Sequence, residues 1–326
     1  MMDRRRFVSA CAGSLVITPS IVKAQPAGKV YRVGFLLGAT EESVVSLFRA
    51  LKEGLQELGY IEGRNLVLDR RYGDGKMERL PDLAGELVRA KVEVIVTGTN
   101  IHVAAARRAT STIPIVMVFA DDPVRAGFVA SLARPGGNVT GLSADASSEL
   151  WGKYLSMLKE LVPKLSRVGV LGQMSSNVGF AELAAASRKL DVALDVGDLR
   201  TAEDLDGAFD AMNRKHVGAV LVIVGPLTYL LRQRISELAL KFHLPAITNV
   251  NQFTQVGLLM SYGPHLPDLY RRAASYVDKI LRGATPADLP VEQPSKFELT
   301  INLKTARSLG VVIPNSLLLT AAEVIQ

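Results

Sequence analysis

Short apolar runs alternate with amphipathic segments along nearly the whole chain from residue 29 onward. In the segment 41–58, for example, apolar residues recur at three- and four-residue steps, which is the period of a helix with one buried face. The runs between such segments are almost continuously apolar, as in the central strands of a parallel sheet that is covered on both faces. The alternation therefore predicts an α/β fold, with parallel strands in the middle and helices on both sides.

The pattern occurs twice, in two halves of similar size. The first half contains the expected strands 30–37, 65–71, 92–97, 113–119 and 139–142 and the expected helices 41–58, 77–90, 102–109 and 124–133. The second half contains the expected helices 149–161, 181–189, 202–213 and 230–242 and the expected strands 168–171, 193–196, 217–224 and 245–248. A strand at 257–261 and a helix at 268–281 would then return to cover the first half. The chain is predicted to form two doubly wound parallel-sheet lobes.

The beginning of the chain has the composition of a secretory signal peptide, residues 1–24. Three consecutive arginines from Arg4 precede the apolar run 8–22, and the small residue Ala24 stands before the expected cleavage bond. The run is too short to span a bilayer, and Pro19 interrupts it. We therefore expect the mature chain to be exported as a soluble protein. Because Arg-Arg-x-Phe also fits the twin-arginine pattern, both the general secretory route and the twin-arginine route stay open.

Basic and acidic residues are nearly balanced once this segment is removed. The loss of four basic residues and one acidic residue from the 38 and 32 of the whole chain leaves a net charge of about +3. The remaining Lys and Arg are scattered among acidic residues rather than grouped with aromatic ones, so no nucleic-acid partner is expected. Cys11, the only cysteine, lies in the removed segment. The mature chain is then expected to have neither a disulfide nor a thiolate site.

Polar loops follow most of the predicted strands. In an open parallel sheet, ligands bind beyond the carboxyl ends of the strands, so these loops are where a site is expected. Their hydroxyl, amide and backbone N–H groups can hold an anion such as a carboxylate at helix N-termini. The alternatives are that the small polar residues merely cap the helices that follow, and that the tyrosines serve packing rather than ligand stacking. The candidate ligand-binding residues are Thr40, Thr99, Asn100, Asp121, Asp122, Ser175, Ser176, Asn177, Pro226, Tyr229, Asn249 and Tyr262.

Common catalytic and nucleotide-binding motifs are absent from the sequence. It lacks a G-x-x-x-x-G-K-[ST] phosphate loop, a G-x-G-x-x-G after the first strand and a G-x-S-x-G elbow. The four histidines have no metal-binding spacing and are expected at the surface or at helix ends. The adjacent carboxylates Asp121 and Asp122 could act as acid and base, but a cap on the helix expected after Pro123 also explains them. We expect neither a metal nor a cofactor.

Several motifs resemble those of one protein family. They are LQELGYIEGRN (55–65), LARPGGNVTGL (132–142), LMSYGP (259–264), PVEQPSKFELTINLK (290–304) and ARSLG (306–310). All are similar to motifs of the ABC transporter substrate-binding protein family related to tryptophan-binding lipoproteins. The resemblance implies a type 1 periplasmic binding fold, in which two α/β lobes are joined by three crossings. The implied lobes are an N-terminal one of residues 29–143 plus 254–285 and a C-terminal one of residues 144–253 plus 286–326.

The resemblance also implies a function, that of a periplasmic receptor for an ABC importer. Such a receptor closes its lobes over a small molecule, here an amino acid or a carboxylate-like compound, and presents it to a permease in the inner membrane. We expect a monomer without chemistry of its own. Two rival hypotheses are an exported enzyme that uses Asp121 or Asp122, and a sensing module for a membrane kinase. The family commonly has Thr-Pro where this chain has Asn100-Ile101, and Asp-Pro where it has Gly225-Pro226, so a relative's ligand cannot simply be transferred.

We expect signal peptidase to cleave between Ala24 and Gln25, because a small residue ends the apolar segment and a loop-like stretch with Pro26 and Gly28 follows. Amino-terminal sequencing of the exported protein should therefore begin at Gln25. A different first residue, or a lipid attached to Cys11, would contradict this prediction.

Overall fold

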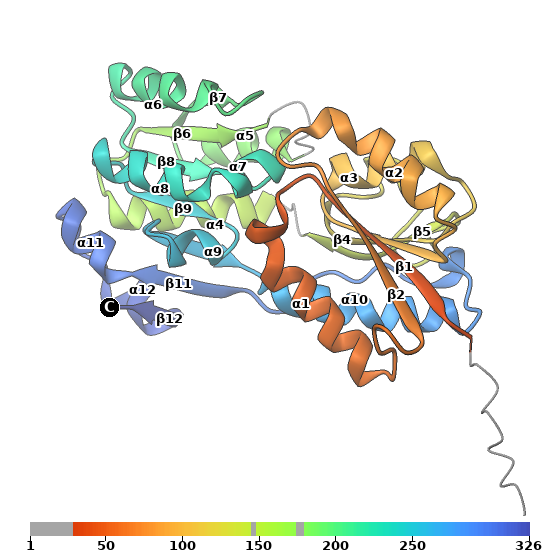
Figure 1. The fold of residues 1–326 in the computed structure, drawn as a ribbon. Helices are drawn as coiled ribbons and strands as arrows, with labels where there is room; N and C mark the ends of the chain where they lie inside the picture. The colour runs from red at the N-terminus through yellow and green to blue at the C-terminus, as the bar shows by residue number, and fades with distance from the viewer. Residues whose placement is uncertain (1–28, 145–147, 174–178) are drawn as a thin grey trace, which may run out of the picture.

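The protein forms two α/β lobes that lie side by side (Figure 1). The computed structural model describes residues 29–144, 148–173 and 179–326. Each lobe has a central sheet in which most or all neighbouring strands run parallel. The α/β class and the two parallel-dominated sheets predicted from the alternating pattern are therefore confirmed.

The first lobe is built on five parallel strands. They are β1 (Tyr31–Leu37), β2 (Leu66–Tyr72), β3 (Val94–Thr97), β4 (Ile115–Asp121) and β5 (Val139–Ala144), paired in the order β2-β1-β3-β4-β5. The helical elements that alternate with them are α1 (Glu41–Glu57), the 3-10 turn η1 (Met77–Arg79), α2 (Leu80–Arg89) and α3 (Asn100–Ala109). A helix from much later in the chain, α10 (Leu266–Leu281), packs beside α1 (Figure 1). Because side chains alternate along a strand, Val94 and Val96 pack on the α1 and α10 side, while Ile95 packs with α2 and α3.

The second lobe is built on seven strands. They are β6 (Arg167–Gly172), β7 (Ala193–Asp198), β8 (Ala219–Val222), β9 (Ala246–Thr248), β10 (Met260–Gly263), β11 (Glu298–Asn302) and β12 (Ala321–Ile325), in the order β12-β11-β10-β9-β8-β6-β7. Their neighbours pair in parallel except for β10 and β11, in which Met260 lies opposite Ile301. The helices of this lobe are α4 (Ser148–Leu161), α5 (Phe180–Lys189), α6 (Asp204–Arg214), α7 (Pro226–Leu230), α8 (Arg232–Lys241), α9 (Gln252–Gln255), α11 (Leu303–Leu309) and α12 (Asn315–Thr320).

The chain passes between the two sheets after β5, between β10 and α10, and before β11. Two of these passages lie later in the chain than the lobe bounds implied by the resemblance. Those bounds put residues 254–285 in the first lobe, but β10 pairs with β9 and β11 of the second sheet. They put residues from 286 onward in the second lobe, but Glu292 still forms a bridge with Leu142 of β5. An apolar run predicts that a strand is buried. It does not predict which of the two sheets the strand joins, because that depends on which sheet has a free edge.

One predicted helix does not form. Residues 124–133 follow a helical pattern, yet they form turns and bends. Asp122 and Gly127 have φ values of +33° and +70°, and this left-handed backbone interrupts an α-helix. The Asp122 carboxylate accepts a hydrogen bond from the backbone N–H of Arg125 at 3.1 Å, so it closes a turn rather than capping a helix.

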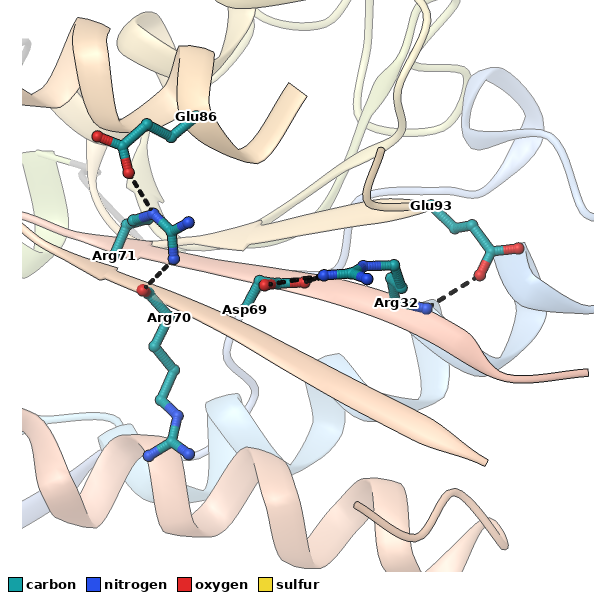
Figure 2. Close-up of polar contacts among 6 residues, drawn as sticks. All are labelled: Arg32, Asp69, Arg70, Arg71, Glu86 and Glu93. Atoms are coloured by element: carbon teal, nitrogen blue, oxygen red, sulfur yellow. Dashed lines mark hydrogen bonds and ion pairs between the residues drawn. The ribbon is translucent and has the colours of Figure 1, made fainter. Parts of the chain in front are cut away.

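The edge strand β2 carries charged side chains. Arg32 on β1 donates three hydrogen bonds to the carboxylate of Asp69 on β2, at 3.0 to 3.2 Å, and Arg71 on β2 donates to Glu86 on α2 at 2.6 Å (Figure 2). These ion pairs hold β2 against its neighbours. Charge on an edge strand also discourages pairing with a strand of another molecule. Within the described ranges, no helix combines the length and the apolar character needed to cross a membrane.

A glycine allows α1 and α10 to approach closely. A Cβ atom at Gly54 would lie 2.6 Å from the backbone oxygen of Arg271 and 2.9 Å from the Cβ of Ala274. The same pair of helices is joined by the hydroxyl of Tyr60, which donates to Asp278 at 2.9 Å. These contacts hold α10 in the first lobe, although it directly follows a strand of the second.

Gly54→Ala should destabilise the protein by about 1–3 kcal/mol, because the added methyl group meets the backbone of α10. Gly207→Ala is the matched control, since Gly207 is exposed on α6 and a Cβ there would meet nothing within 4 Å. At that position alanine should stabilise by about 0.5–1 kcal/mol through its higher helix propensity. Urea unfolding measures both changes, and effects of the same sign would contradict the close packing at Gly54.

Candidate functional site

A cleft lies between the lobes, where the loops after β1, β3 and β4 face the loop after β8. Its larger part, which we call the apolar chamber, has about 420 Å³ of empty space, counting its open mouth. The first lobe lines it mainly with Leu37, Val44, Leu47, Phe119, Leu266 and Tyr270, and the second lobe with Val224, Gly225, Pro226 and Tyr229.

A second part of the cleft, which we call the polar chamber, has about 330 Å³ of empty space. The first lobe lines it with Asn100 and Asp121, and the second lobe faces them with Gln173. The two chambers adjoin, because several residues line both of them. These shared residues are Thr99, Val224, Gly225 and Pro226.

A buried histidine ties two loops of the first lobe together. His102, in the first turn of α3, is only 3% exposed, and its Nε2 accepts a hydrogen bond from the backbone N–H of Gly38 at 2.8 Å. The proton is therefore on Nδ1, which lies 3.1 Å from Thr99 Oγ1. Burial lowers the pKa of His102 to about 4, so the ring is neutral near pH 7. His102 lies at a helix end, one of the two places expected for the histidines, and it is buried because its ring bridges the loops after β1 and β3.

Asn100 fixes the end of β4 and with it the position of Asp121. Its side-chain amide donates to the backbone oxygen of Asp121 at 2.9 Å and accepts from the backbone N–H of Asp121 at 2.8 Å. Asp121 itself lines the polar chamber. Burial, followed by the negative charge of Asp122, raises the pKa of the Asp121 carboxyl to about 7.

Tyr229 brings a buried hydroxyl to the apolar chamber. Pro226 begins α7, and Tyr229 lies on the same short helix with 6% of its surface exposed. The hydroxyl of Tyr229 has no hydrogen-bond partner among the described residues, while the guanidinium carbon of Arg232 lies 4.8 Å from the ring centroid. Burial raises the pKa of Tyr229, so the hydroxyl keeps its proton and can donate. A buried hydroxyl without a partner is unfavourable, and a ligand atom would satisfy it.

Besides Asn100, two of the predicted site residues use their side chains within the protein. Thr40 caps α1, since its Oγ1 accepts from the backbone N–H of Ser43 at 3.4 Å, and it is the preceding residue, Ala39, that lines the apolar chamber. The carboxylate of Asp122 closes the turn already described, whereas Asp121 lines the polar chamber. Thr40 thus matches the capping alternative, whereas the Asp122 side chain holds a turn instead of a helix end.

Two more predicted residues belong to the second lobe and are not among the residues that line the two chambers. Tyr262 stacks on Phe297 with ring centroids 5.8 Å apart. Asn249 keeps a buried side-chain oxygen without a hydrogen-bond partner among the described residues. Ser175, Ser176 and Asn177 lie outside the described residues, and their role stays a prediction.

The sequence reasoning missed the apolar lining of the cleft. Leu266 and Tyr270 come from α10, and Val44 and Leu47 come from α1, so none of the four lies in a strand-end loop. Their helical spacing marks them as core residues, which they also are. The place of Leu266 and Tyr270 at the cleft follows only from the return of α10 to the first lobe. Within the described parts of the chain, no three His, Cys, Asp or Glu side chains are grouped as a metal site would require.

The neutral state of His102 should make stability depend on pH. Its folded-state pKa of about 4 lies below its usual value of 6.5, so the unfolded chain binds the extra proton as the pH falls through that window. Relative to His102→Gln, the wild type should therefore lose up to about 3 kcal/mol of unfolding free energy between pH 7 and pH 4. Asp121 acts in the opposite direction but is present in both proteins, so the difference isolates the histidine. Parallel pH profiles of the two unfolding free energies would contradict the assignment.

Comparisons with known proteins agree with this two-lobed architecture. The model of the family described as ABC transporter substrate binding protein matches residues 38–325. A tyrosine-binding protein of Clostridioides difficile (strain R20291) is 27% identical over 265 residues, which is 79% of this chain and 75% of that protein.

Two solved structures superimpose on nearly the whole described chain. A conserved domain protein from Vibrio cholerae has a TM-score of 0.85 at 26% identity, and an ABC domain in complex with L-Trp from Streptococcus pneumoniae has a TM-score of 0.84 at 25% identity. In each case 91% of this chain and 100% of the other chain are covered. The expected type 1 periplasmic binding fold is thereby confirmed. The family match, over most of the chain, shows that this protein belongs to the ABC transporter substrate-binding protein family.

Proposed function

We propose that the protein is an exported receptor of an ABC importer that binds a small organic acid with an apolar tail, such as an amino acid. The observation that carries this proposal is the continuous cleft between the lobes, in which an apolar chamber adjoins a polar one. The apolar chamber suits a hydrophobic side chain, and the polar chamber suits a charged head group. The tyrosine-binding relative and the L-Trp complex support the same class of ligand.

Two helix N-termini at the cleft offer donors for a carboxylate. Gly98 and Thr99 precede α3, Ala39 lies just before α1, and all three line the apolar chamber. The free N–H groups and the positive end of the helix dipole at such positions favour an anion. We therefore expect the ligand carboxylate near the start of α3, because Thr99 lies where the two chambers meet.

Closure of the lobes would enclose such a ligand. Arg125, which follows β4, donates from Nη1 to Oε1 of Glu182 on α5 at 2.6 Å, so this ion pair joins the two lobes. Half of the Arg125 side chain is exposed, and an exposed pair of this kind contributes no more than about 1 kcal/mol. We expect the ligand to contribute more than this ion pair to the stability of the closed state. A molecule that contacts both lobes interacts better with that state and shifts the population toward it.

The other parts of the proposal rest on the sequence and on the family. The segment 1–24 supports export to the periplasm, and family membership supports delivery to a permease in the inner membrane. We propose a monomer that releases its ligand chemically unchanged. An enzyme in which Asp121 and Asp122 act together as acid and base is disfavoured, because Asp122 is engaged in a turn while Asp121 alone lines the cleft.

Calorimetric titration of the mature protein with L-tryptophan, L-tyrosine, L-phenylalanine and L-leucine tests the proposal. At least one of them should bind, raise the Tm and reduce the radius of gyration in solution X-ray scattering, and it should be recovered intact. Tryptamine, which lacks the carboxylate, should bind more weakly than L-tryptophan. If none of the amino acids binds, or if a bound one is steadily converted to product, the receptor proposal fails.

Tyr229→Phe should weaken binding of the amino acid found in that panel by about 2- to 12-fold, the equivalent of one hydrogen bond of 0.5–1.5 kcal/mol. Without ligand the same variant should be as stable as the wild type or slightly more stable, because it removes an unpaired buried hydroxyl. Tyr262→Phe serves as the control and should leave affinity unchanged, since Tyr262 packs on Phe297. Equal losses of affinity in both variants would argue against the apolar chamber as the ligand site.

A further inference from the structure

Asp121 occupies a defined position in the polar chamber. It is the last residue of β4, and both hydrogen-bonding groups of its backbone are held by the side chain of Asn100. Gln173, Gly225 and Pro226 line the same chamber from the second lobe. The carboxylate therefore lies between the lobes on a rigid support, where a bound molecule would meet it.

No cationic side chain pairs with this carboxylate among the described residues. The ion pairs of the described chain leave Asp121 out, and the charge that acts on it is the like charge of Asp122. The nearest basic residue in sequence, Arg125, is instead paired with Glu182. The segments 145–147 and 174–178 contain neither Lys nor Arg. A partly desolvated carboxylate next to a second negative charge is unfavourable as an ion unless a cation approaches it.

We propose that Asp121 binds the ammonium group of the ligand, so that the cleft selects a free amine in addition to a carboxylate. This inference rests on the proposed function and narrows its ligand class from organic acids to zwitterionic amino acids. The shared lining of the two chambers puts Asp121 beside the region in which the apolar tail lies. The unpaired hydroxyl of Tyr229 is a second polar group of the same cleft that lacks a protein partner among the described residues. An ammonium group has three donors and meets the carboxylate with a charge-assisted hydrogen bond.

The test compares each amino acid that binds with the analogue that lacks its amine. The pairs are L-tryptophan with indole-3-propionate, L-tyrosine with 3-(4-hydroxyphenyl)propionate, L-phenylalanine with 3-phenylpropionate and L-leucine with 4-methylpentanoate. The wild type should bind the amino acid about 10- to 150-fold more tightly than its analogue, the range of one hydrogen bond to a charged group. Equal affinities within a pair would overturn the role of Asp121 and leave the proposed function standing. Failure of every amino acid and every analogue to bind would instead overturn the proposed function, and this inference with it.

Asp121→Asn adds a readout that misfolding cannot imitate. It should weaken binding of the amino acid by about 10- to 150-fold but strengthen binding of the analogue without the amine, because two carboxylates no longer repel each other. Asp122→Asn removes the same charge one residue away and keeps a side chain that can close the turn, so its effect should be several-fold smaller. Parallel losses for amino acid and analogue in Asp121→Asn, or equal losses in the two variants, would overturn the proposal.

Discussion

Parallel pairing is the constraint on which the cleft depends. In a parallel sheet, the strands run in one direction, so the loops after β1, β3 and β4 all emerge at the same edge of the first sheet. The loops after β8 and β9 do the same in the second sheet. Because the chain crosses between the sheets at these ends, the two sets of loops face each other. Residues that are far apart in sequence, such as Thr99 and Gly225, thus line one cleft.

Buried polar contacts then hold the loops of the first lobe in place. The neutral ring of His102 joins Gly38 to Thr99, and the amide of Asn100 joins α3 to the end of β4. Both contacts use groups that would be costly to bury without partners. They leave the first lobe's wall of the cleft preorganised, so less conformational entropy is lost when a ligand binds. Asp121 and Tyr229 differ, because among the described residues the functional group of each side chain lacks a partner.

Most of the secondary structure was predictable from periodicity, and the errors have physical reasons. The pattern of apolar residues predicts buried strands such as β3 and β4, and it predicts amphipathic helices such as α1. The stretch 124–133 has helical spacing, but left-handed backbone at Gly127 ends the helix before it can form. For the site, the strand-end rule found Thr99, Asn100, Asp121, Pro226 and Tyr229, all of which line the cleft. The rule could not distinguish these residues from Thr40 and Asp122, whose side chains serve a cap and a turn. The same small polar residue types are used for such local contacts and for binding ligands.

The sequence by itself determined the α/β class, the two-lobed organisation, the family and the loops in which a site is expected, because these depend on local periodicity and on motifs within short stretches. Only the tertiary structure decided that β10 joins the second sheet while α10 returns to the first, since a strand takes whichever free edge the rest of the fold provides. Only that return brings Leu266 and Tyr270 to the cleft and gives it an apolar wall. The partner of each polar group was likewise a matter of three-dimensional proximity. His102 has two hydrogen-bonding partners, whereas Asp121 has no cationic partner among the described residues. No sequence pattern tells a polar residue with partners from one without them.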